Sequence, residues 1–294
     1  MSFSIGIVGL PNVGKSTLFK ALTKKPVDIG PYPFTTLHPN VGVVQVPDER
    51  LKKIAEIIKP EKITPTIIEF IDIAGLIKGS HKGEGLGNQF LAQIRNCHAI
   101  LEVIRAFEDP KVKNVTGNID PASDIETIKI EFELKDMESR EENNLLAKKP
   151  VIYLLNINCK TPYQAPKVEQ LAINLKDEVE IFELSDLEKK ELGMESQLDR
   201  LILACYNVLD LITFYTITGG KETRAWTLKR GLTAPQAGAA VHTDFKEKFI
   251  RAEVINWQKL VEAGSWKEAR EKGWLQVAGR DYIVKDGDVI EFKI

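Results

Sequence analysis

The sequence has few cysteines and no long apolar run, and its charges nearly cancel. Its three cysteines are far apart and lack metal-ligand spacing, which argues against a disulfide framework and favours a reducing compartment. It lacks the roughly eighteen consecutive apolar residues that a membrane-spanning helix needs, and no basic segment leads into an apolar N-terminal stretch. The net charge of -2 gives no sign of a DNA-binding or other nucleic-acid-binding protein. We therefore expect a cytoplasmic protein without a membrane partner.

A phosphate-binding loop is predicted near the N-terminus. Residues 3–18 read as an apolar strand, a loop with the pattern Gly-x4-Gly-Lys-Ser and the start of a helix. In such a P-loop, backbone N–H groups converge on a phosphate, glycine permits the close approach, and the helix N-terminus faces the anion. The strand before it and the helix after it disfavour a chance glycine-rich turn. The residues expected to bind the nucleotide here are Asn12, Val13, Gly14, Lys15, Ser16 and Thr17.

Two later segments add the parts of a magnesium-dependent switch. Residues 28–40 hold three prolines around Phe-Thr-Thr and predict an extended loop. In this loop Thr36 is the preferred Mg²⁺ ligand beside the Ser16 hydroxyl, ahead of the neighbouring threonine, and a turn-capping role is the alternative. After a predicted strand, Asp72 is expected to hold Mg²⁺ through water, and Gly75 to offer its backbone N–H to a γ-phosphate. With Lys15 as the charged group, these elements predict a nucleoside triphosphate switch.

The sequence departs from many switch GTPases at the residue that orients the attacking water. Leu76 follows Gly75, at the place where many switch GTPases have a glutamine, and leucine has no hydrogen-bonding group. His81, within a glycine-rich stretch, is a candidate for this catalytic role. A solvated loop histidine is the favoured alternative reading.

Several long motifs together resemble the Obg-like ATPase family, also called YchF, a branch of the translation-factor-related P-loop NTPases. They are Gly-Leu-Pro-Asn-Val-Gly-Lys-Ser-Thr-Leu (9–18), Tyr-Pro-Phe-Thr-Thr (32–36), Asp-Ile-Ala-Gly-Leu (72–76), Gly-Glu-Gly-Leu-Gly-Asn-Gln-Phe-Leu (83–91), Lys-Glu-Thr-Arg-Ala-Trp-Thr (221–227), Ala-Pro-Gln-Ala (234–237) and Ile-Arg-Ala-Glu-Val-Ile (250–255). The resemblance implies an α/β fold for residues 1–209, a P-loop NTPase domain with a mostly parallel sheet flanked by helices. For residues 210–294 it implies an α+β TGS domain, a ubiquitin-like β-grasp module associated with RNA and ribosome contacts.

The chain departs from the family pattern in two places. The family often has a histidine that is proposed to position the hydrolytic water, and this chain has Asn114 there. An amide can bond a water but cannot accept its proton at neutral pH. The family also inserts a long helical hairpin where this chain has a short charged segment at 136–150, so either the hairpin is absent from this protein or a region is missing from this sequence.

The base-binding end of the site follows a predicted strand at 151–155. The family's Asn-x-x-Glu maps onto residues 156–159, with Cys159 in place of the glutamate. Asn156 is expected to brace the P-loop side of the pocket, with a strand-end turn as the alternative, and Ile157 to pack beside the base. Because a thiol is a poor acceptor, guanine preference is not supported. The resemblance to the family therefore implies ATP, with GTP possible. The family's next strand and its Ser-Ala base-contacting loop are expected to be shortened here to residues 179–185.

These features predict a Mg²⁺-dependent purine nucleoside triphosphatase that acts as a ribosome-associated switch, with ribosomal contact through the TGS domain. The alternative is a nucleotide-dependent ribosome or RNA adaptor that hydrolyses little or nothing, which Leu76 and Asn114 motivate. A small-molecule kinase is a weaker third option, because the glycine-rich segment after Asp72 does not resemble an arginine-rich lid.

Overall fold

The computed structural model describes residues 3–24, 40–73, 93–112, 119–139, 144–158 and 165–294. The chain forms two compact units. We call residues 2–44 with 68–208 the N-terminal unit, and residues 45–67 with 209–294 the C-terminal unit. Among the described residues, no helix is long and apolar enough to cross a membrane.

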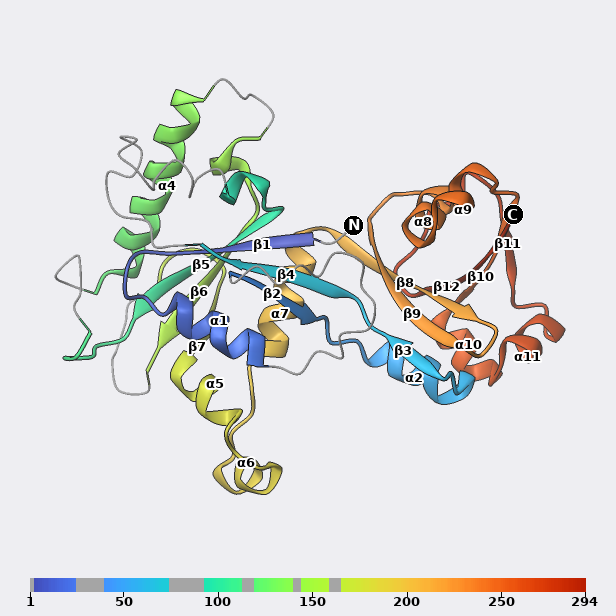
Figure 1. Ribbon diagram of the computed structural model, residues 1–294, viewed down its shortest axis with the longest axis horizontal. Coiled ribbons are helices and arrows are strands. Elements are labelled where there is room, and N and C mark those ends of the chain that lie inside the picture. The colour runs from blue at the N-terminus through green and yellow to red at the C-terminus, as the bar shows by residue number, and fades with distance from the viewer. Residues whose placement is uncertain (1–2, 25–39, 74–92, 113–118, 140–143, 159–164) are drawn as a thin grey trace. The chain divides into compact units, whose positions relative to one another are not determined.

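The N-terminal unit is built on a six-stranded sheet with the order β2-β4-β1-β5-β6-β7 (Figure 1). The strands are β1 (Phe3–Val8), β2 (Val41–Gln45), β4 (Ile67–Asp72), β5 (Ala99–Ala106), β6 (Val151–Ile157) and β7 (Gln170–Ile173). The pairs β1–β4, β1–β5, β5–β6 and β6–β7 are parallel, and every residue of β1 and β5 is buried. The carboxyl ends of these parallel strands therefore meet at one edge of the sheet, where such folds bind ligands.

Helices flank this sheet, which confirms the predicted fold class (Figure 1). The helices of this unit are α1 (Lys15–Lys24), α4 (Pro121–Glu138), α5 (Leu175–Ile181), α6 (Asp186–Leu192), α7 (Leu198–Val208) and the short 3₁₀ helix η2 (Leu146–Lys148). Of these, α6 lies beyond α5, away from the sheet (Figure 1). The long helix α4 begins with Asp120, whose side chain accepts a hydrogen bond from the Ser123 N–H, and with a proline in the first turn. Its Ile125 packs against Ile104 of β5 and Leu155 of β6.

A polar network closes the connection after α4. The Asp136 carboxylate accepts hydrogen bonds from the backbone N–H groups of Leu146 and Ala147 at 3.0 and 2.9 Å, and it pairs with Arg95 at 3.4 Å. Nearby, the Lys149 ammonium donates to the carbonyl oxygens of Arg95 and Cys97. The network ties the charged segment 136–150, which stands where the family has its helical hairpin, to Arg95 and Cys97.

The prediction of a strand within residues 179–185 is wrong. The strand after β6 is β7, which ends at Ile173, and the following residues form α5 instead. The side chain of Asn174 caps this helix by accepting from the Lys176 N–H, and acidic residues occupy its first turn. The cap and the acidic first turn favour a helix here.

The C-terminal unit contains a second six-stranded sheet with the order β11-β10-β12-β8-β9-β3. Its strands are β3 (Lys62–Thr64), β8 (Leu211–Thr218), β9 (Glu222–Lys229), β10 (Arg251–Asn256), β11 (Gln276–Ala278) and β12 (Asp288–Lys293), and its helices are α2 (Glu49–Ile58), α8 (Ala234–Val241), α9 (Thr243–Glu247), α10 (Trp257–Ala263) and α11 (Trp266–Glu271). Most pairs are antiparallel, while β12–β8 and β3–β9 are parallel. This is the mixed α+β architecture that was expected.

The C-terminal unit includes residues 45–67, which the sequence places in the first domain. The difference has three physical causes. Strand β3 pairs in parallel with β9, and Ile54 of α2 lies in one hydrophobic cluster with Tyr215 and Leu260. In addition, the hydroxyl of Tyr215 donates to Asp48, the residue that caps α2. A linear boundary cannot show a pairing between segments so far apart in sequence.

The packing of α2 can be tested through tryptophan fluorescence, because the chain's tryptophans all lie in 209–294. Ile54 is fully buried, so Ile54→Ala should lower the free energy of unfolding by about 2–4 kcal/mol. We expect the midpoint of the denaturation transition, followed by tryptophan fluorescence, to move to a lower denaturant concentration. Lys52→Ala, on an exposed position of the same helix, should leave it in place, and an unmoved transition for Ile54→Ala would contradict this assignment of 45–67.

A buried carboxyl group lies in the sheet of the N-terminal unit. Glu102 on β5 is 3% exposed, and its Oε1 has no hydrogen-bond partner in the described structure. Burial, and secondly the Asp124 carboxylate on α4, raise the pKa of Glu102 from 4.5 to about 8. Between these two pH values the folded protein retains a proton that the unfolded chain has released. Glu102 therefore makes the protein less stable as pH rises from about 4.5 to about 8.

This linkage predicts a pH-dependent effect of Glu102→Gln, which keeps the shape and removes the titration. At pH 8 the variant should be more stable than the wild type by about 1–3 kcal/mol, and near pH 5 the two should be similar. Urea unfolding at both pH values measures this difference. Glu133→Gln, at an exposed position of α4, is the control, and an equal pH dependence in the wild type and Glu102→Gln would count against the prediction.

Candidate nucleotide-binding site

The loop between β1 and α1 has a backbone that only certain residues can adopt. Gly9 and Gly14 have φ values of 151° and 108°, and Asn12 lies at 64°. A Cβ atom at Gly14 would lie 2.4 Å from the side-chain nitrogen of Asn156, and one at Gly9 would lie 2.4 Å from the carbonyl oxygen of Val103. Both glycines are therefore required by backbone conformation and by close contact.

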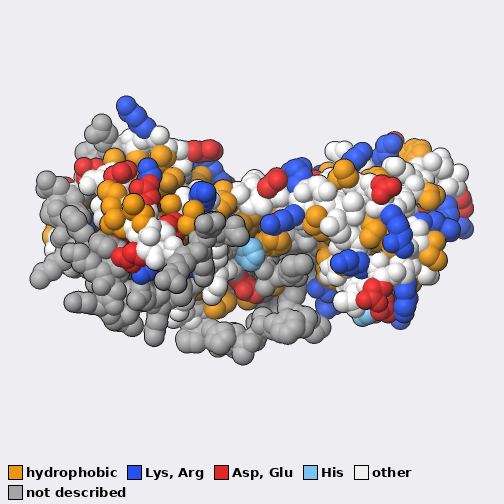
Figure 2. All heavy atoms as spheres, turned by 90° about the horizontal axis from the view of Figure 1, so that it is seen from above, with side chains coloured by type: hydrophobic (Ala, Val, Ile, Leu, Met, Phe, Trp, Pro, Cys, Tyr) orange, Lys and Arg blue, Asp and Glu red, His pale blue; other side chains and the backbone are white. Residues whose placement is uncertain are grey.

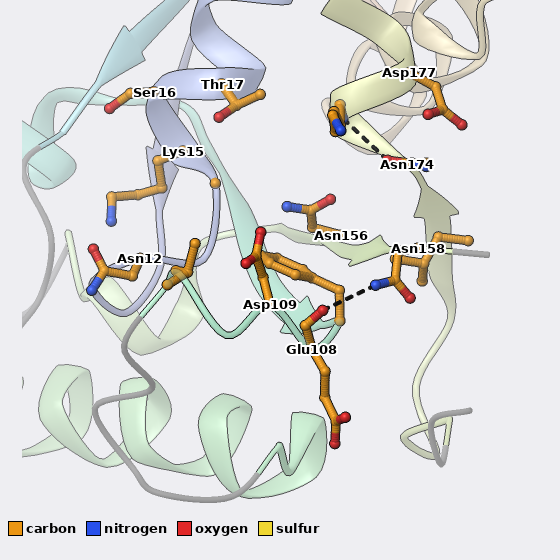
Figure 3. Close-up of a pocket in the computed structure, with 15 residues that line it drawn as sticks. Asn12, Lys15, Ser16, Thr17, Glu108, Asp109, Asn156, Asn158, Asn174 and Asp177 are labelled. Carbon is orange, nitrogen blue, oxygen red and sulfur yellow. Dashed lines mark hydrogen bonds between the residues drawn. The ribbon is translucent and has the colours of Figure 1, made fainter. Parts of the chain in front are cut away.

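Lys15 is the first residue of α1, and its side chain curls back over the loop (Figure 3). It is 8% exposed, and its Nζ donates to the carbonyl oxygens of Gly9 and Leu10, each at 3.0 Å. Burial lowers the pKa of Lys15, and the carboxylate of Asp72, at the end of β4, opposes that shift. Burial likewise raises the pKa of Asp72, opposed by Lys15. The two predicted site residues thus interact electrostatically.

Asn156, the residue before the end of β6, connects three segments through its side-chain amide. Its Nδ2 donates to the carbonyl oxygen of Val13 at 2.9 Å, and its Oδ1 accepts from the backbone N–H of Leu175 at 3.2 Å. Only 7% of Asn156 is exposed. This is the contact with the P-loop side that the sequence predicted for Asn156.

A cavity of about 810 Å³ opens over this loop, within the range of ligand sites in proteins. Four segments form its walls, namely the loop with the start of α1 and the chain that follows β5, β6 and β7. All four lie beyond the carboxyl ends of parallel strands. The lining residues are Asn12, Gly14, Lys15, Ser16, Thr17, Phe107, Glu108, Asp109, Val112, Asn156, Ile157, Asn158, Asn174, Lys176 and Asp177.

Most of the predicted nucleotide-binding residues line this cavity. Val13 differs, because it is 2% exposed and contributes its backbone carbonyl instead. Asp72 is linked to the cavity through its interaction with Lys15. The remaining predicted residues lie outside the described residues, and they are Thr36, Gly75, His81, Asn114 and Cys159.

Half of the cavity wall was not found by reading the sequence. The missed residues come after β5, at the end of β6 and after β7, and they are Phe107, Glu108, Asp109, Val112, Asn158, Asn174, Lys176 and Asp177. The available signal was topological, because residues that follow the carboxyl ends of neighbouring parallel strands face the same cleft. Because the sequence analysis did not predict β7 at its observed position, the residues that follow β7 could not be assigned to this cleft.

The phosphate-binding loop, the parallel sheet and the cavity at the carboxyl ends of its strands define a P-loop NTPase. Residues 4–157 match the family model MMR_HSR1, described as a 50S ribosome-binding GTPase, and residues 211–294 match the model YchF-GTPase_C, described as a protein of unknown function. The chain belongs to the YchF family.

Individual relatives support this membership. The chain is 42% identical to the "Ribosome-binding ATPase YchF" of Haemophilus ducreyi, covering 100% of this chain and 99% of the relative, and 38% identical to the protein of the same name from Bacillus subtilis, with the same coverage. The structure of the Schizosaccharomyces pombe YchF GTPase matches with a TM-score of 0.85 at 31% identity, covering 99% of this chain and 98% of that one. The match to the H. ducreyi protein extends over 361 residues, more than the 294 of this chain, so that relative contains residues that this chain lacks.

The bridging amide of Asn156 generates a prediction about binding. Asn156→Ala removes both hydrogen bonds and leaves the Val13 carbonyl and the Leu175 N–H without this partner, so the loop and α5 should be less well fixed. We expect nucleotide affinity to fall about tenfold, equivalent to roughly 1.4 kcal/mol. Isothermal titration calorimetry measures this change. Asn144→Ala, which removes hydrogen bonds to Arg95 and Lys149 away from the cavity, should bind like the wild type, and unchanged affinity in Asn156→Ala would contradict the bracing role.

Proposed function

We propose that this protein is a Mg²⁺-dependent purine nucleoside triphosphatase, with ATP favoured and GTP possible, that acts as a ribosome-associated switch in the cytoplasm. The observation that carries the proposal is the buried Lys15 at the base of a cavity whose loop and helix N-terminus are built for phosphate. The name that the H. ducreyi and B. subtilis relatives share, "Ribosome-binding ATPase YchF", supports the choice of ATP and of the ribosome.

The residues around the loop fit a magnesium ion chemically. The Ser16 hydroxyl lines the cavity and the Asp72 carboxylate interacts with Lys15, and hydroxyl and carboxylate oxygens are ligands that Mg²⁺ prefers. We assign Ser16 and Thr36 as direct ligands and Asp72 as a ligand through water. A bound Mg²⁺ would supply positive charge to the phosphate oxygens.

The remaining roles follow from the same assignment. Lys15 would exchange its two carbonyl acceptors for phosphate oxygens and stabilise the charge that develops on them. The backbone N–H of Gly75 would contact the γ-phosphate, while Asn114, with His81 as a further candidate, would orient the attacking water. Asn156 would hold the loop, and Ile157 would pack beside the base.

We assign the ribosome contact to residues 210–294, the TGS domain that the family resemblance implies, which form most of the C-terminal unit. Lys and Arg side chains are spread over the face of this unit in Figure 2, mixed with acidic ones. A surface of mixed charge favours short-range contacts with RNA or ribosomal protein over long-range electrostatic steering.

A second candidate is a nucleotide-dependent ribosome adaptor that hydrolyses little or nothing. Leu76 favours it, because a leucine cannot hydrogen-bond the attacking water. Single-turnover hydrolysis with and without ribosomes separates the two functions. A rate at background in both conditions, combined with nucleotide-dependent co-sedimentation with ribosomes, would establish the adaptor and reject the enzyme.

The proposed enzyme predicts a strong loss of ATP hydrolysis in Lys15→Ala and Ser16→Asn. Removing a group that stabilises the transferring phosphate typically costs about 100-fold or more in rate, and we expect both variants to fall by at least that amount. Lys24→Ala, at the other end of α1 where the side chain pairs with Glu183, should retain wild-type turnover. Unchanged hydrolysis in both site variants would refute the proposal.

A further inference from the structure

A buried arginine holds one wall of the cavity from behind. Arg105, near the carboxyl end of β5, is 5% exposed and is not a lining residue. Its Nε donates to the carbonyl oxygen of Phe107 at 3.0 Å, and its Nη2 donates to the carbonyl oxygen of Val112 at 3.1 Å. The guanidinium carbon lies 4.7 Å from the centre of the Phe107 ring. One side chain therefore connects both ends of the segment 107–112.

Other hydrogen bonds also shape that segment. Within it, the Asp109 side chain accepts from the Lys111 N–H, and the Asp109 carbonyl accepts from the Val112 N–H at 3.0 Å, which forms a turn. On its outer side, Asn158 of the cavity wall donates to the Glu108 carbonyl at 3.2 Å. The turn fixes the local shape, and the two Arg105 hydrogen bonds tie both ends of the segment to β5.

The charge of Arg105 is partly balanced inside the fold. Burial and Asp120 raise the pKa of Asp124 on α4 to about 6, and Arg105 acts against that rise. A buried guanidinium opposite a carboxylate is less costly than an isolated buried charge. The arginine is thus placed to act through its hydrogen bonds without contacting the cavity itself.

We propose that Arg105 is a positioning residue of the nucleotide site, fixing segment 107–112 as a preformed wall and thereby raising nucleotide affinity. This inference rests on the proposed function. Phe107, Glu108, Asp109 and Val112 all line the cavity, and a wall ordered before binding spares the cost of ordering it when the nucleotide arrives. The planar fork of arginine suits two carbonyl acceptors and one aromatic face, which a single lysine ammonium cannot satisfy together.

The test compares Arg105→Lys, which keeps the charge opposite Asp124 and loses the fork, with Arg105→Gln, which loses the charge. ATP binding with Mg²⁺ is measured by calorimetry at a temperature well below unfolding, together with kcat and KM. We expect the Kd and KM to rise at least fivefold in Arg105→Lys and more in Arg105→Gln, with kcat within about threefold of the wild type. Hydrogen exchange of residues 107–112 in the nucleotide-free protein should accelerate in both variants.

The matched control is Arg95→Lys in the same unit. Arg95 has a partly buried side chain that bonds the Asn144 carbonyl and the Asp136 carboxylate, away from the cavity. This change should lower the melting temperature and leave Kd, KM and exchange of 107–112 unaltered. Wild-type affinity and exchange in Arg105→Lys, or an equal loss of affinity in Arg95→Lys, would overturn the positioning role. Failure of the wild type to bind ATP or GTP would instead refute the proposed function.

Discussion

The amide of Asn156 is the contact on which the geometry of the site depends. It joins the loop after β1 to the start of α5 across the sheet, because one end donates to Val13 and the other accepts from Leu175. A buried amide has to be satisfied at both ends, so this geometry fixes the distance between the two segments. The same amide explains the requirement for glycine at position 14, since a Cβ there would collide with its nitrogen. Loop and strand end therefore constrain each other.

Around that contact, the cavity obtains its shape from strand ends and its charge from a small number of buried groups. Lys15 is surrounded by its own loop carbonyls and by Asp72, so its positive charge is held at one place without free rotation. Phosphate oxygens would replace weak neutral acceptors, and little side-chain entropy would be lost on binding. The wall after β5 follows the same logic, since it is anchored from the interior by Arg105 and does not depend on the ligand to order it.

The sequence predicts those parts of the site whose determinants are contiguous. The strand, the Gly-x4-Gly-Lys-Ser loop and α1 follow one another directly, and the structure places this loop at the cavity as expected. Strand β7 was misplaced because four residues beside a well-capped helix give a weak alternating pattern. The roles of Asn158, Asn174 and Arg105 depend on which strands are neighbours in the sheet. Local sequence reasoning does not contain that information.

The assignment of residues 45–67 to the C-terminal unit changes how the chain connects the two units. Strand β2 follows the predicted metal-binding loop, and β4 ends at Asp72; between them the chain leaves the N-terminal unit, forms α2 and β3, and returns. The two segments predicted to respond to the nucleotide therefore flank, in sequence, a part of the other unit. Helix α2 is held in the C-terminal unit by core packing and by the bond from Tyr215 to Asp48. The chain therefore joins the two segments proposed to contact the nucleotide through a folded part of the C-terminal unit.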